Sequence, residues 1–163
     1  MKQPVLYCFD IDGTLAEHGT EALQMFEDSP DSIAALLALR AYPNIVQLIT
    51  QAIAAPNATV MFCTGRPVSL YGPTWRWLNR HLRLADVGKR VSVVCRPEEV
   101  ALGAIPQFKL SELVQAVRRV RPVELRCYDD NVQNLRLFGT LRSLVKSLRL
   151  YRCEDGVVSA WCL

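Results

Sequence analysis

The sequence lacks the features that mark membrane, secreted and repeat proteins. None of its apolar runs approaches the roughly 18–20 residues that a membrane-spanning helix needs, so we expect no membrane segment. The chain begins with MKQPVLYCFDIDG, whose early acidic pair does not suit a signal peptide, and we therefore expect a cytoplasmic protein. It contains no repeat, low-complexity segment or linker, which predicts a single domain over residues 1–163.

Signatures of a zinc site are missing as well. None of the six cysteines forms a CxxC pair, and neither His18 nor His81 has a second histidine or a cysteine at metal spacing. We assign no role to either histidine. Without a secretion signal the cysteines are predicted to be free thiols. Four of them fall inside apolar runs, where a small thiol packs as an ordinary core residue: Cys8, Cys63, Cys95 and Cys127.

Charge is spread unevenly along the chain. Residues 1–60 hold two basic and seven acidic side chains, a net charge of −5, whereas residues 61–163 hold 17 basic and nine acidic side chains, a net charge of +8. The basic part favours an anionic partner, although a solvated arginine-rich surface would give the same count. The charge pattern alone does not choose between these interpretations.

Short apolar runs typical of strands alternate with amphipathic stretches typical of helices. The predicted strands cover residues 4–9, 59–63, 91–95 and 123–128, and the predicted helices cover residues 29–40, 43–54, 73–84, 108–120 and 131–138. This alternation predicts an α/β protein with a Rossmann-like, three-layer arrangement around a parallel sheet.

Two regions fall outside this alternation. Residues 147–153 and 157–163 flank the tripeptide EDG, which predicts a C-terminal β-hairpin that either extends the sheet or covers one edge. Residues 15–42 make a small cap-like insert, too short for a large cap domain.

Polar residues follow each predicted parallel strand. They are Asp10-Ile11-Asp12-Gly13-Thr14, Thr64-Gly65-Arg66, Arg96 and Asp129-Asp130, with Lys109 at the start of the helix before the fourth strand. Ligands of such sheets bind beyond the carboxyl ends of the strands, so we expect these groups to share one edge. Because residues i and i+2 of a strand share a face, Asp10 and Asp12 are expected to lie side by side.

Four carboxylates at one edge repel one another unless cations offset them. Mg²⁺ suits this donor set, because it takes oxygen ligands from one or two carboxylates together with substrate phosphate. The hydroxyl, the lysine and the arginines suit a phosphoryl group. One aspartate would attack phosphorus to form an aspartyl-phosphate, and the other would protonate the leaving oxygen and then activate water.

The motifs DIDGT, CTGR, Lys109 and YDD stand in the order of the four motifs of the haloacid dehalogenase superfamily of phosphohydrolases, which the chain resembles from residue 5 to about residue 138. The resemblance implies that Asp10 is the nucleophile and Asp12 the general acid/base. An aspartate two residues after the nucleophile is the phosphatase version of the first motif, and the dehalogenases lack it.

The same resemblance implies the remaining roles. Thr64 and the Gly65 amide would bind phosphate, with Gly13 and Thr14 of the first motif beside them, and Lys109 would bridge phosphate and nucleophile. Mg²⁺ would be held by Asp10, Asp130 and the Asp12 carbonyl, with Asp129 in support.

A narrower likeness rests on CTGRP, TWRWLNRHL, VVCRP and the FK that precedes YDD. These resemble the phosphatase domain of polynucleotide kinase/phosphatases and related RNA-repair phosphatases. The likeness implies that Arg66 and Arg96 hold the substrate phosphate, and that the substrate is a 3′-phosphate on a nucleic-acid end. The chain departs from that pattern in three ways: only Glu98 and Glu99 follow RP, Asn131 stands where an arginine is common, and there is no GxxxxGK[ST] kinase loop.

Other functions remain open. A phosphatase of mononucleotides or small phosphorylated metabolites would use the same motifs. A receiver domain of a signalling system also combines an acidic pair, a phosphorylated aspartate, a threonine and a lysine, but it carries its acidic pair first and its nucleophile later. A non-catalytic phosphate-binding protein of this fold would normally have lost one of the acidic residues, and here none is missing.

Overall fold

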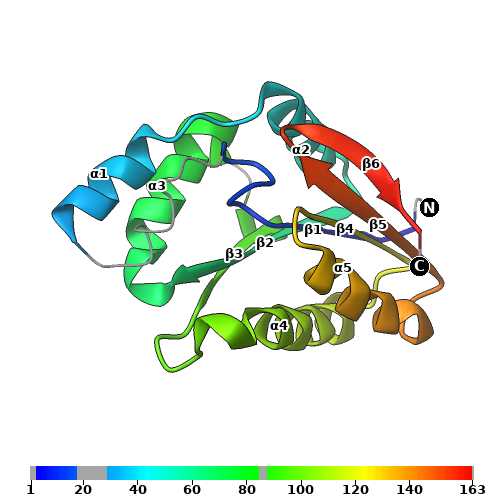
Figure 1. Cartoon of the computed structure of the whole chain (residues 1–163). Coiled ribbons are helices and arrows are strands. Elements are labelled where there is room, and N and C mark those ends of the chain that lie inside the picture. Colours follow the sequence, from blue (N-terminus) through cyan, green and yellow to red (C-terminus); the bar gives the residue numbers. More distant parts are fainter. Residues whose placement is uncertain (1–2, 18–28, 85–87, 163) are drawn as a thin grey trace.

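A computed structural model describes residues 3–17, 29–84 and 88–162. Within these residues the chain forms a six-stranded sheet in the order β3-β2-β1-β4-β5-β6 (Figure 1). The first five strands are parallel and the sixth is antiparallel to β5. The strands are β1 (Val5–Phe9), β2 (Ala58–Pro67), β3 (Val91–Arg96), β4 (Glu124–Asp129), β5 (Ser147–Glu154) and β6 (Val157–Trp161). The predicted α/β class and the predominantly parallel sheet are confirmed.

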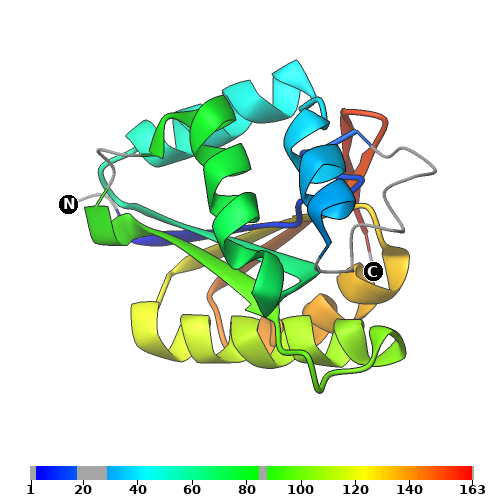
Figure 2. The same ribbon diagram turned by 90° about the vertical axis from the view of Figure 1, so that its left-hand side faces the viewer.

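Helices cover both faces of this sheet (Figures 1 and 2). One face packs against α1 (Pro30–Ala38), α2 (Pro43–Ala54) and α3 (Tyr71–Leu82). The other packs against α4 (Ile105–Val120) and α5 (Val132–Phe138), together with the short 3₁₀ helix Gly139–Ser143. The three layers expected from the alternation of strands and helices are therefore present in the described residues.

The two layers of core follow from the period of two along each strand. In β1, Leu6 and Cys8 are buried against α4 and α5, whereas Phe9 is buried on the side of α1–α3. Because both faces of the central strands are covered, these strands read as continuous apolar runs rather than as alternating ones. All six cysteines are free in the structure, and five of them are buried, as expected for small core residues.

The predicted C-terminal hairpin extends the sheet. Its first strand, β5, pairs in parallel with β4, so it is a fifth parallel strand as well as one arm of the hairpin. The turn places Asp155 and Gly156 at φ +50° and +76°, the left-handed pair that a two-residue hairpin turn requires. The tip rests on the start of α2: a Cβ on Gly156 would lie 2.7 Å from the ring of Tyr42, and the Asn44 amide donates to the Gly156 carbonyl.

Several predicted boundaries were wrong. Strand β2 does not stop at residue 63 but continues through Pro67, because its backbone goes on pairing with β3 after an irregularity between Thr64 and Pro67. The helix expected from residue 108 begins at Ile105, where Pro106 suits a first turn. The helix expected to reach residue 84 ends at Leu82, because Arg83 adopts a left-handed φ of 54°.

Of the expected cap-like insert, the structure describes residues 15–17 and 29–42. Helix α1 packs against α3, and the Trp77 indole donates a 2.9 Å hydrogen bond to the Leu39 carbonyl just beyond it. His18 lies outside the described residues. In the part of the chain that is described, no helix is long and apolar enough to cross a membrane.

Candidate active site

The candidate site lies where the order of the strands reverses, at the carboxyl ends of β1 and β4. Asp10 follows β1 directly, Asp129 ends β4, and Asp130 comes next. The Asp10 amide donates a 2.9 Å hydrogen bond to the Tyr128 carbonyl, which continues the pairing of the two strands up to the acidic residues. Strand order reverses between these two strands, and such a switch point leaves a crevice for ligands.

Lys109 joins the two strands from the layer of helices. It lies in the second turn of α4, and its Nζ is 2.6 Å from Asp10 Oδ1 and 3.0 Å from Asp129 Oδ2. The three side chains are each at least 95% buried. Burial alone would lower the pKa of Lys109, but the two carboxylates raise it well above its ordinary value, so the lysine remains charged. The structure thus brings together the residues that sequence analysis placed at one edge.

The single ammonium group of Lys109 does not neutralise the charge of all the carboxylates near it. Carboxylate oxygens of Asp10, Asp129 and Asp130 lie within 4.8 Å of one another. Burial, and then the neighbouring carboxylates, raise the pKa of Asp10 well above its ordinary value, although Lys109 acts in the opposite direction. A divalent cation would remove this repulsion. Because the donors are all oxygens, they fit a hard ion such as Mg²⁺.

The three carboxylates are not equivalent. Asp129 is nearly saturated, since its oxygens accept from Lys109, from the Asn131 amide at 2.9 Å and from the Asn134 side chain at 2.9 and 3.0 Å. Among the residues that the structure describes, Asp10 Oδ2 accepts only a long 3.5 Å bond, from Thr14. Asp10 is therefore better placed than Asp129 to bind a ligand, and Asp129 is better placed to support it.

Sequence analysis missed Asn134. It lies in the first turn of α5 and is 2% exposed, and its side-chain amide donates to both oxygens of Asp129. The available signal was the spacing of Asn131 and Asn134 after YDD, which places two amides in the first turn of a helix facing the strand end. The cap of this helix is Asn131, whose side chain accepts from the Gln133 amide.

Asp12 has a different partner. The guanidinium of Arg66 holds it with two bonds, Nη2 to Oδ1 at 2.6 Å and Nε to Oδ2 at 2.9 Å. The Thr64 hydroxyl lies 3.4 Å from the same carboxylate. Strand β1 ends at Phe9, so the alternation that was expected to align Asp10 with Asp12 does not extend to them. Each carboxylate instead pairs with its own cation.

Arg66 is completely buried. Besides Asp12 it contacts the Thr74 hydroxyl at 3.4 Å, and its guanidinium lies 5.5 Å from the centre of the Trp77 ring. Both of these residues belong to α3. The arginine expected to bind substrate phosphate therefore directs its donors to protein groups, and its clearest contact is the carboxylate proposed as acid/base.

Arg96 is likewise turned inward. It is 6% exposed, its Nε donates to the Gly65 carbonyl at 3.0 Å, and its Nη1 donates to the Val100 carbonyl. These contacts fasten the end of β2, where a Cβ on Gly65 would come within 2.9 Å of the Ile105 side chain at the start of α4. Arg96 thus holds the end of the strand that carries Thr64 rather than an open anion site.

The first motif closes in a tight turn. The Ile11 carbonyl accepts from the amides of Leu15 and Ala16 at 2.8 Å, and Gly13 adopts a φ of 81° that favours glycine.

Gly13 and Asp130 line a cavity of about 200 Å³ beside the carboxylates. Its other wall is the end of β5 and the hairpin tip, including Arg152 and Glu154, which sequence analysis did not associate with the site.

Comparisons with known proteins add no assignment. No protein-family model matches the chain, and no curated protein matches it either.

The pairing of Lys109 yields a prediction about stability. Replacing it in the variant Lys109→Met leaves buried carboxylates without their cation, so we expect a loss of roughly 3–5 kcal/mol in the free energy of unfolding. Millimolar Mg²⁺ should restore more stability to this variant than it adds to the wild type. Urea unfolding with and without Mg²⁺ measures both effects.

The matched control is Lys146→Met, because Lys146 is exposed. It should unfold like the wild type in both conditions. Wild-type stability of Lys109→Met in chelator, or equal gains from Mg²⁺ in variant and wild type, would contradict the electrostatic account of the cluster.

Proposed function

We propose that the protein is a Mg²⁺-dependent phosphatase of the haloacid dehalogenase type that works through an aspartyl-phosphate on Asp10. One observation carries the proposal: Lys109 bridges Asp10 and Asp129 beside Asp130, although these residues come from three separate places in the chain. A lysine between a nucleophile and a cation-binding carboxylate suits transfer of a phosphoryl group, whose oxygens carry the developing charge.

In the first half of the reaction, a carboxylate oxygen of Asp10 attacks phosphorus and the bond from phosphorus to the leaving oxygen breaks. A proton from Asp12 goes to that oxygen. In the second half, Asp12 takes a proton from a water molecule that attacks the same phosphorus. The bond between phosphorus and Asp10 then breaks, which releases phosphate and regenerates the carboxylate. Mg²⁺, held by Asp10 and Asp130 with Asp129 in support, would neutralise charge on the phosphoryl oxygens.

Arg66 has a role in this scheme that differs from phosphate binding. Its hydrogen bonds engage both oxygens of Asp12 and hold the carboxylate in one orientation. Thr64 lies against the same carboxylate. Arg66 is therefore proposed to position the acid/base residue.

The first test is the variant Asp10→Asn. It should abolish hydrolysis of p-nitrophenyl phosphate, since the amide cannot form the acyl phosphate, and excess chelator should do the same to the wild type. Asp31→Asn, an exposed position in α1, is the matched control and should keep full activity.

Turnover by Asp10→Asn comparable to that of the wild type would refute the mechanism. If the wild type instead incorporated one equivalent of phosphate and stopped, the phospho-signalling alternative would replace the phosphatase proposal.

A second test separates the roles of Asp12 and Arg66. Asp12→Ala should lose about 10²–10⁴-fold in kcat on an alkyl phosphate, and less on p-nitrophenyl phosphate, whose leaving group needs no proton. Arg66→Lys should show the same dependence on the leaving group, to a smaller degree and with little change in KM. Thermal melting of each variant checks that it folds.

The alternative role of Arg66 predicts different kinetics. If this arginine holds the substrate phosphate, its replacement would raise KM and slow both substrates equally. Equal losses on both substrates in Asp12→Ala would show that Asp12 is not the acid/base group.

The substrate class is proposed to be a 3′-phosphate on a nucleic-acid end, with mononucleotides and small phosphorylated metabolites as the alternative. The supporting observation is now the net charge of +8 over residues 61–163, because Arg66 and Arg96 are engaged by protein groups. A 3′-phosphorylated oligonucleotide should have a higher kcat/KM than the other substrates, and this difference should decrease as the salt concentration rises.

The measurement compares kcat/KM for 3′- and 5′-phosphorylated oligonucleotides, mononucleotides and sugar phosphates at two salt concentrations. Equal cleavage of monomers and oligomers would leave a phosphatase of small molecules as the better assignment.

A further inference from the structure

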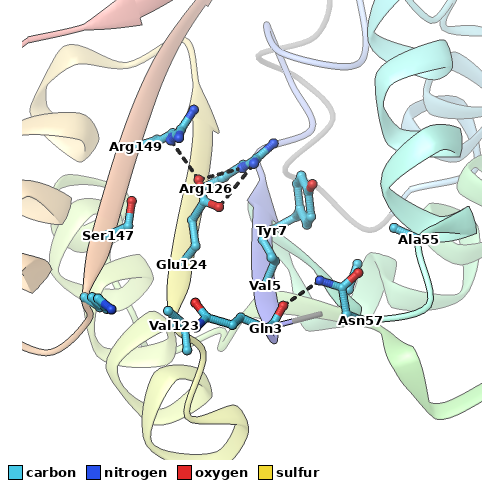
Figure 3. Close-up of a pocket in the computed structure, with 12 residues that line it drawn as sticks. Gln3, Val5, Tyr7, Ala55, Asn57, Val123, Glu124, Arg126, Ser147 and Arg149 are labelled. Atoms are coloured by element: carbon cyan, nitrogen blue, oxygen red, sulfur yellow. Dashed lines mark hydrogen bonds and ion pairs between the residues drawn. The ribbon is translucent and has the colours of Figure 1, made fainter. Parts of the chain in front are cut away.

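A second cavity lies at the opposite edge of the sheet, among the amino-terminal ends of β1, β2, β4 and β5 (Figure 3). Its volume is about 600 Å³, within the range of ligand-binding cavities. Its walls include Tyr7, Glu124, Arg126, Lys146 and Arg149, a set that we call the basic groove. None of these residues belongs to the candidate active site.

The basic groove exists because one face of β4 and β5 is polar here. Glu124, Arg126 and Arg149 remain partly exposed on that face. The residues that alternate with them on β4, Leu125 and Cys127, are completely buried on the other face, within the core formed with α4 and α5. The alternation leaves a row of charged side chains facing solvent between the strands and the end of α2 (Figure 3).

Positive charge exceeds negative charge in the groove. Glu124 is shared by two arginines, accepting from Arg126 Nε at 3.0 Å and from Arg149 Nε at 2.7 Å. Arg126 also lies 5.3 Å from the centre of the Tyr7 ring, so its guanidinium is held from two sides. One carboxylate therefore faces two guanidinium groups and the ammonium of Lys146, a surplus of two positive charges among the residues that line the cavity.

The accessible donors lie at the rim. The Arg149 side chain is 56% exposed and Lys146 is exposed, so their donors are open to a ligand that approaches from solvent. A site for a small molecule usually encloses most of its ligand and is largely apolar. Charged side chains in the wall and exposed cations at the rim suit the phosphates of an extended polyanion, which guanidinium groups bind through paired hydrogen bonds.

We propose that the basic groove is a second phosphate-binding site, separate from the carboxylate edge, which binds the backbone of a nucleic-acid strand. The proposal deepens the proposed function and rests on it for the choice of a nucleic-acid ligand. Five residues of a parallel strand span about 17 Å, so a phosphate in the groove lies well away from one at Asp10. Binding in the groove can therefore be measured without catalysis.

The test uses a single-stranded oligonucleotide of about 20 nucleotides with a 3′-hydroxyl end and excess chelator, so that no turnover occurs, in salt between about 50 and 200 mM. The variant Lys146→Gln/Arg149→Gln removes two rim cations and keeps the pair of Glu124 with Arg126. The matched control, Arg119→Gln/Arg142→Gln, removes two exposed arginines on the other side of the sheet, one from α4 and one from the 3₁₀ helix Gly139–Ser143. Fluorescence anisotropy gives the dissociation constant of each protein.

The slope of log K against log salt should be less steep by about 1.4 in the groove variant, since each contact to a single strand contributes about 0.7. The control should keep the slope of the wild type. Equal slopes in all three proteins, or equal losses in groove variant and control, would overturn the proposal. So would tighter binding to anionic phospholipid vesicles than to the oligonucleotide at matched phosphate concentration.

Hydrolysis of p-nitrophenyl phosphate separates this proposal from the proposed function. The groove variant should hydrolyse it at the rate of the wild type. If the wild type hydrolyses no phosphate ester but binds the oligonucleotide through the basic groove, the phosphatase proposal is wrong and the proposal of a phosphate-binding groove is retained.

Discussion

A buried ammonium between two carboxylates is the contact on which the candidate site depends. Lys109 ties the helix α4 to the ends of β1 and β4, and it does so in a position where neither charge would be tolerated alone. The contact fixes the separation of Asp10 and Asp129, and with it the place where Asp130 meets them. Packing of α4 through Phe108 and Leu113 then holds the lysine in place, so the core and the site constrain each other.

The second ion pair gives the two aspartates of the first motif different surroundings. Asp12 binds Arg66, which extends from β2 and packs against α3, whereas Asp10 binds Lys109 of α4. Two carboxylates separated by one residue thereby receive different surroundings: one is almost completely buried and the other is 17% exposed at its side chain. A difference of this kind is what allows two chemically identical groups to act as nucleophile and as acid/base.

Sequence patterns identified the elements of the sheet and the residues that gather at its edge, because both follow from chain order and from the period of each element. They could not give the direction of long side chains. Arg66 and Arg96 stand at strand ends, as a phosphate site would require, yet each finds a protein acceptor close by, Asp12 for one and the Gly65 carbonyl for the other. Nor does a pattern reveal which strand β5 joins, since its pairing with β4 depends on packing over α5 rather than on local sequence.

The contact between the hairpin tip and α2 joins parts of the chain that are far apart in sequence, which affects the order in which the protein folds. Asn44 and Gly156 are 112 residues apart, and Lys109 and Asp10 are 99 apart, so both the wall and the centre of the candidate site depend on contacts that close very large loops. Such contacts are expected to form late in folding, because closing a large loop costs chain entropy before the contact can stabilise the protein. Helices α2 and α3 are therefore able to form on β1 and β2 well before the carboxylates meet. We therefore expect the site to be assembled among the last steps of folding, when β4 and β5 complete the sheet.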